Sequence, residues 1–79
     1  MKKLQEMIES VEEKIKWEQK EIDRYMEDVK HCANSERAED VAVFMPGYVR
    51  SLNEALERQK AYKEQLNMLR FLEKEQNED

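Results

Sequence analysis

His31 and Cys32 are the residues whose types could support catalysis, because an imidazole can activate a neighbouring thiol as a nucleophile. The two are adjacent in sequence, and adjacent positions on a helix point about 100° apart, so they cannot share a proton. Cys32 also falls on a repeat of apolar residues, where a small buried thiol is the usual role. We therefore expect no catalytic residue here.

Acidic residues before His31 could supply metal ligands. Glu27 and Asp28 lie four and three positions earlier, a spacing that places two ligands on one helical face. One histidine and one carboxylate make only half of a site, and the chain has no second histidine. Its single glycine, Gly47, also excludes a glycine-rich phosphate loop. We expect neither a metal nor a cofactor.

The stretch Ser51-Leu52-Asn53-Glu54-Ala55-Leu56 resembles part of the Ser-x-Glu-Leu-Asp core of the small aspartyl-phosphate phosphatases of spore-forming bacteria, which are also helical hairpins. The Glu-Leu-Asp triplet is missing from this chain. The segment that we expect to connect its two helices, residues 34–45, is also longer than the connection in that family. The phosphatase activity is therefore not carried over to this chain, and we expect that the protein is not an enzyme.

Apolar residues recur every seven positions in both halves of the chain, the pattern of two helices packed as a coiled coil. The first half holds Met1, Ile8, Ile15, Ile22 and Val29 at one core position, and Leu4, Val11, Tyr25 and Cys32 at the other. The second half holds Met45, Leu52 and Leu66, and Tyr48, Ala55, Tyr62 and Leu69. The pattern predicts one all-α domain, an antiparallel two-helix hairpin with helices at about residues 2–33 and 46–75 and a frayed acidic tail, 76–79.

Residues 34–45 are expected to connect the two helices. Asn34 and Ser35 favour caps and turns, whereas Pro46 suits the first turn of a helix and disfavours helical geometry in the residue before it. The sequence leaves open whether the connection contains a short helix. Ser35 could cap a helical turn, but Val41–Phe44 is strand-like in composition.

Two polar residues, Glu18 and Gln59, interrupt the apolar repeats. Facing residue numbers in an antiparallel pair add to a constant, and a constant of 77 brings the two interruptions into one layer and sets Ile22 opposite Ala55. A slip by one heptad would bury each polar residue against an apolar one. We predict that Glu18 and Gln59 specify the register at some cost in stability.

Composition excludes several classes of function. Charged residues make up 42 % of the 79 residues and the net charge is -5, which argues against nucleic-acid binding through phosphate contacts. No run of residues approaches the length of a membrane span, and the N-terminus turns acidic before any apolar segment that could form a signal peptide. We expect a cytoplasmic protein that binds no membrane and, with one cysteine, forms no internal disulfide.

Several apolar residues lie outside the expected core, and so small a domain gains stability from a second copy of itself or from a bound protein. We predict a homodimer that forms a four-helix bundle. Its predicted self-association residues are Met7, Met26, Leu56, Met68, Phe71 and Leu72. The predicted partner-binding residues are Val41, Val43, Phe44, Met45 and Trp17.

These features favour a non-catalytic regulator or adaptor that binds a larger protein, for example an inhibitor encoded by a phage or another mobile element. The alternative is a purely structural coiled-coil unit that assembles with itself. An acidic mimic of nucleic acid is a third hypothesis, disfavoured because lysine and arginine interleave evenly with the acidic residues.

Overall fold

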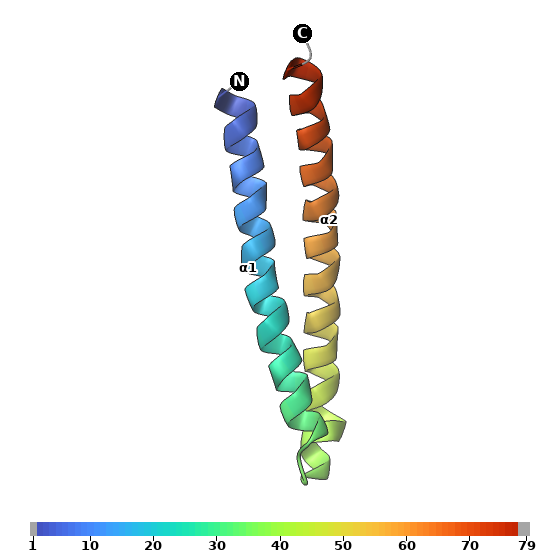
Figure 1. Ribbon diagram of the computed structural model, residues 1–79. Coiled ribbons are helices and arrows are strands. Elements are labelled where there is room, and N and C mark those ends of the chain that lie inside the picture. Colours follow the sequence, from blue (N-terminus) through green and yellow to red (C-terminus); the bar gives the residue numbers. More distant parts are fainter. Residues whose placement is uncertain (1, 78–79) are drawn as a thin grey trace.

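The computed structural model describes residues 2–77, and within this range the chain forms helices and no strand. Helices α1 (Lys2–Ala33) and α2 (Met45–Asn77) pack against each other and run antiparallel, so both ends of the chain lie at one end of a rod (Figure 1). The rod measures 62 × 14 × 14 Å. The predicted all-α hairpin is confirmed, whereas Met1 and two residues of the expected tail, 78–79, lie outside the described range.

Backbone and side-chain hydrogen bonds close the end of α1 and fix the turn that follows. The N–H groups of Asn34 and Ser35 donate to the carbonyl oxygens of Lys30 and Cys32, at 3.0 and 3.2 Å. The Ser35 hydroxyl accepts a hydrogen bond from the Arg37 N–H (3.1 Å) and donates one to Asp40 Oδ2 (2.6 Å). The Asn34 bond is the last helical bond of α1, four residues back, and the bonds of Ser35 replace the helical ones beyond Ala33.

The connection between α1 and α2, expected at residues 34–45, contains a short helix. Helical structure resumes at Ala38, passes through the π-helical segment η1 (Asp40–Phe44) and continues into α2. The α-helix α2 begins at Met45, one residue before the expected start at Pro46, but the expectation of non-helical geometry at Met45 is wrong. Met45, the residue before the proline, has helical angles (φ −57°, ψ −43°).

The π-helical turn explains how a helix tolerates this proline. Pro46 has no N–H, and in an α-helix its ring would crowd the carbonyl four residues earlier. In η1 the Met45 N–H instead bonds to Asp40 O, five residues back, which widens the turn directly before the ring.

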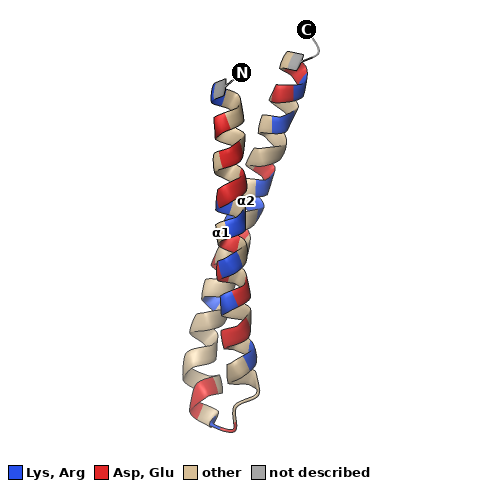
Figure 2. Cartoon of the chain, turned by 60° about the vertical axis from the view of Figure 1, so that its left-hand side comes forward, with Lys and Arg blue, Asp and Glu red and all other residues tan. Residues whose placement is uncertain are grey.

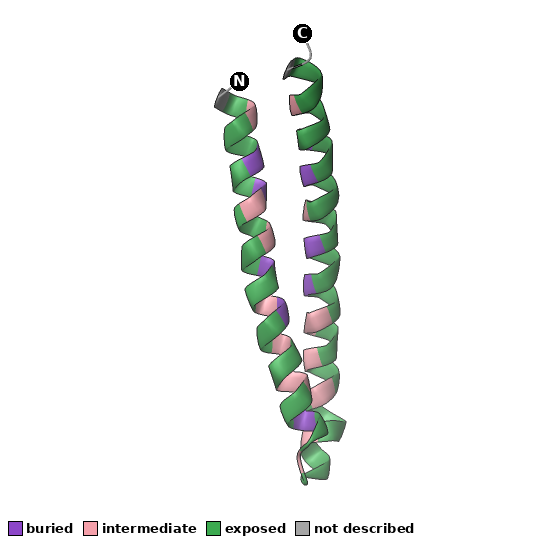
Figure 3. Cartoon of the chain, viewed as in Figure 1, coloured by how far each residue is buried: buried purple, intermediate pink, exposed green. Residues whose placement is uncertain are grey.

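The core is a single seam between the two helices, where the buried residues face each other (Figure 3). One cluster joins Ile8 and Val11 of α1 to Leu66 and Leu69 of α2, with partly buried neighbours Leu4, Ile15 and Tyr62. Each of these layers agrees with the register constant of 77. Ile22 and Ala55, the predicted facing pair, are also buried.

The half of the rod near the turn is packed less completely. Five of its core residues are only half-buried: Tyr25, Val29, Met45, Tyr48 and Leu52. Two helices enclose a seam from two directions only, so large side chains in it remain open at the edges. Cys32, a smaller residue, is the buried member of this half.

Gly47 gives a test of whether the backbone next to Pro46 is helical. It has no positive φ, and a Cβ added there would meet no atom within 4 Å. Glycine inside a helix costs roughly 0.5–1 kcal/mol relative to alanine. We expect Gly47→Ala to raise the free energy of unfolding in urea by about that amount. An unchanged or lower unfolding free energy would contradict helical geometry around Gly47.

Candidate functional site

A polar layer lies buried in the middle of the seam, where Glu18 and Gln59 are 4 % and 6 % exposed. Arg58 Nε donates to Glu18 Oε1 at 3.0 Å. Gln59 Nε2 donates to Gln19 Oε1 at 2.9 Å and to the carbonyl oxygen of Ile15 at 3.3 Å. Within the described residues, the second oxygen of Glu18, Oε2, is buried without a hydrogen-bond partner.

This layer is held together by charge but is incompletely satisfied. The hydrogen bond to Glu18 raises the pKa of the Arg58 guanidinium, although desolvation opposes the shift. A buried carboxylate oxygen without a partner is destabilising. We therefore expect the layer to contribute to the choice of register and to add little to the free energy of unfolding. Sequence reasoning missed Arg58 and Gln19. Gln19 directly follows Glu18 and Arg58 directly precedes Gln59, so both flank the seam.

Replacing both polar core residues tests this interpretation. We expect Glu18→Leu/Gln59→Leu to raise the free energy of unfolding by about 1–3 kcal/mol, because apolar contacts replace an incompletely satisfied layer. The loss of register specificity should appear as extra amide resonances in the NMR spectrum of the double variant.

Removing only the counter-charge should act in the opposite direction. We expect Arg58→Met to lower the free energy of unfolding by about 1–3 kcal/mol, because Glu18 stays buried without its ion pair. The exposed Arg50 is the control, and Arg50→Met should change stability by less than about 0.5 kcal/mol. Equal effects of the two arginine variants would contradict a structural role for the Arg58–Glu18 pair.

The candidate chemical residues His31 and Cys32 do not form a reactive pair. Cys32 is buried in the seam, whereas His31 is exposed. Burial, assisted by the charges of Asp40 and Asp28, raises the pKa of the Cys32 thiol. A thiol that resists ionisation is a poor nucleophile. In the described part of the chain, no group of three or more metal-ligand side chains comes together.

Cys32 should therefore react slowly with iodoacetamide. We expect alkylation of the folded protein at pH 7.5 to be at least about tenfold slower than in urea, because the thiol is covered and stays protonated. Mass spectrometry of timed samples measures the alkylation rates, and equal rates would contradict a buried cysteine.

The raised pKa of Cys32 also predicts a pH dependence of stability. The unfolded thiol ionises at lower pH than the folded one, so the free energy of unfolding should fall as the pH rises above about 8.5.

The predicted partner-binding residues do not form one surface. Val41, Val43 and Phe44 are exposed on η1, at the tip of the rod, and Met45 beside them is half-buried. Trp17 is exposed as well, but it lies in the middle of α1, about 25 Å along the helix from the turn.

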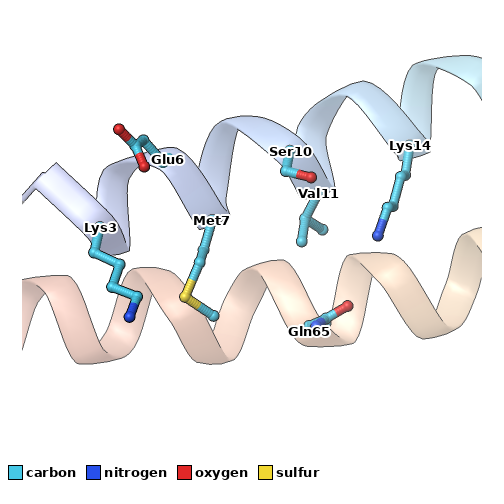
Figure 4. Close-up of a pocket in the computed structure, with 7 residues that line it drawn as sticks. All are labelled: Lys3, Glu6, Met7, Ser10, Val11, Lys14 and Gln65. Carbon is cyan, nitrogen blue, oxygen red and sulfur yellow. The ribbon is translucent and has the colours of Figure 1, made fainter.

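The predicted self-association residues divide between two side faces of the hairpin. Met7, Met68 and Leu72 flank one side of the seam near the chain ends. A groove on this side is lined by both helices, with Lys3, Met7 and Lys14 directed from α1 toward α2 (Figure 4). We call this side the Met7 face.

The opposite side, the Met26 face, carries Met26 of α1 and Leu56 of α2, both exposed and both nearer the turn. An ion pair between Glu12 and Arg70 (3.3 Å) closes the seam on this side. Phe71 belongs to neither face and points outward from α2 beside Met68, in a shallow hollow.

No protein-family model, curated protein or solved structure matches this chain. Neither described helix contains a segment that is both long and apolar enough to cross a lipid bilayer. Basic and acidic residues both occur along each helix (Figure 2).

Proposed function

We propose that this chain is a non-catalytic protein-binding module, a small acidic regulator that acts in the cytoplasm as a homodimer and modulates a larger protein. The observation that supports binding is the exposed apolar tip formed by Val41, Val43 and Phe44. In a protein of 42 % charged residues, three such side chains gathered on one helical turn are an expected anchor for a partner.

The tip is suited to this role because its backbone is ordered before binding. The hydrogen bond from Ser35 to Asp40 joins the turn to η1, and helix α2 continues directly from it. An anchor held in place loses little conformational entropy on binding. Charged residues on the turn, including the Arg37–Glu39 ion pair, form a polar rim that can orient the partner. Phe44 is the proposed central anchor, filling an apolar pocket whose occupation would inhibit the partner.

A structural unit that only assembles with itself is the second candidate. It is favoured by the large exposed surface of the rod, 6345 Å². The arrangement of charge gives no support to nucleic-acid mimicry, because a phosphate strand is uniformly negative whereas both signs alternate here (Figure 2).

Paired charge substitutions separate these functions. Immobilised wild type, Phe44→Asp and Phe71→Asp would be exposed to extracts of the native host, after circular dichroism has shown that each is helical. We expect a stoichiometric foreign protein on the wild type, a 10- to 100-fold weaker interaction with Phe44→Asp, and retention by Phe71→Asp. Phe71 is the matched control, since it is the other exposed phenylalanine.

Two outcomes would contradict the regulator. If Phe44→Asp keeps both its fold and the partner, the tip is not the binding site. If the wild type recovers only further copies of itself, the structural alternative is correct.

A further inference from the structure

One stripe of residues runs along each helix on the Met7 face. The stripe on α1 consists of Lys3, Met7, Ser10, Lys14, Trp17, Glu21 and Arg24. The stripe on α2, in the opposite chain direction, consists of Glu75, Leu72, Met68, Gln65, Ala61, Arg58 and Glu54. Both alternate steps of four and three residues, the spacing that keeps side chains on one side of a helix in a coiled coil. All of them except the half-buried Glu21 are exposed.

The two stripes are level with each other, residue by residue. Because the helices are antiparallel, level positions have numbers that add to 78 or 79. Three level pairs join opposite charges: Lys3 with Glu75, Glu21 with Arg58, and Arg24 with Glu54. Within the chain, Arg24 also pairs with Glu21, and Arg58 with Glu18. Two join a large side chain to a small one: Trp17 with Ala61, and Met68 with Ser10. Met7 is level with Leu72, and Lys14 with Gln65.

We infer that the Met7 face is covered by the Met7 face of a second copy, with the twofold axis along the rod. This rotation lays α1 of one chain over α2 of the other without an axial shift, so that every level pair becomes a contact between chains. Charges then meet opposite charges, and Trp17 and Met68 meet the small residues that leave room for them. The result is a four-helix bundle of antiparallel neighbours with both tips at one end.

A twofold axis across the rod gives a much poorer fit. It would lay α1 over α1 in reverse, which brings Lys14 beside Lys14 of the second copy and Lys3 beside Arg24. On α2 it would bring Glu54 beside Glu75. Like charges in contact disfavour such an arrangement, so the charges select the axis along the rod.

The Met26 face is less suitable for the same symmetric contact. On this face the positions at nearly equal height have numbers that add to 75 or 76. Lys16 is therefore level with Lys60, and two copies would place lysines together. Gln19 is level with Leu56, which sets a polar side chain against an apolar one.

The exposed area of the single chain agrees with a contact between two copies. The chain exposes 6345 Å², whereas a compact monomer of 9.6 kDa exposes roughly 5100 Å². The surplus, roughly 1200 Å², is the area that one subunit buries in a large homodimer interface. The assignment rests on the homodimer in the proposed function, and it is independent of binding at the tip.

A matched pair of leucines tests which face is used. Leu72 on the Met7 face and Leu56 on the Met26 face lie on the same helix and are 43 % and 44 % exposed. In sedimentation experiments, we expect Leu72→Lys to weaken the dimer at least about tenfold and Leu56→Lys to change it less than about twofold. Circular dichroism checks that both variants are helical. The reverse order, or an equal effect of both, would overturn the assignment.

A charge exchange tests the pairing between chains, and it does not depend on a variant that could unfold. Lys3→Glu and Glu75→Lys each place like charges together in their own homodimer. Mixed, they form a heterodimer in which both contacts join opposite charges. We expect native mass spectrometry to show heterodimer at several times the statistical share. A statistical mixture would overturn the contact of α1 with α2.

The direction of the axis is measured by a spin label at the exposed Ala38, close to the tip. Two rods packed side by side with tips together should give a label distance below about 35 Å. An axis across the rod would separate the tips by about the 62 Å length of the rod and would overturn the inference. The wild type is the labelling control, because its Cys32 is buried.

The outcomes for the two proposals can be told apart. A wild type that stays monomeric at high micromolar concentration would overturn both the homodimer and the face assigned to it. It would leave the Phe44→Asp comparison unaffected, because that experiment measures the tip. Loss of partner binding in Leu72→Lys but not in Leu56→Lys would show that the Met7 face binds the partner and would overturn its assignment to a second copy.

Discussion

Glu18 and Gln59 are buried in one layer of the seam, at the alignment of the two helices on which the surface features of the hairpin depend. An apolar seam alone tolerates a slip of one heptad, because each apolar residue would meet another. The polar layer does not, since a slip would bury the Glu18 carboxylate away from Arg58. The alignment also creates the Glu12–Arg70 ion pair and the groove between Lys14 and Gln65, because both bring together residues that are distant in sequence.

A second constraint is the number of helices. Two helices bury one narrow seam, and the large residues near the turn, such as Tyr25 and Tyr48, remain half-buried. The rod therefore leaves apolar surface in four places: the tip, the Met7 face, the Met26 face and the hollow at Phe71. These surfaces lie at different heights and on different sides, so a single contact cannot cover them all. In the proposed dimer the tip therefore stays free for the proposed partner.

The sequence predicts much of the fold but less of the surface. The heptad repeats and their two polar interruptions were enough to predict the hairpin, and the layers found around Ile8 and Leu69 agree with the register derived from them. Pro46 did not predict that the residues before it are helical, because a π-helical turn relieves a clash that local rules treat as a helix boundary. The surface of each outer apolar residue was harder to predict, because Trp17, named among the partner-binding residues, lies about 25 Å from the tip. Their faces follow only from the alignment of both helices.

In the proposed dimer, the register of the two helices within one chain also determines how well two chains fit together. A twofold axis along the rod allows no axial shift, so the pairs formed between copies have the same register as the pairs within one copy. A slip of one heptad in the hairpin would set Trp17 level with Met68 or Glu54 in place of Ala61, and it would separate Lys3 from Glu75. Glu18 touches the Met7 face only through its hydrogen bond with Arg58, yet in the proposed dimer Glu18 and Gln59 set the register on which the match of that face depends. A polar layer that stabilises the single chain poorly can therefore be favourable for the assembly, because it excludes the registers in which two copies would not fit.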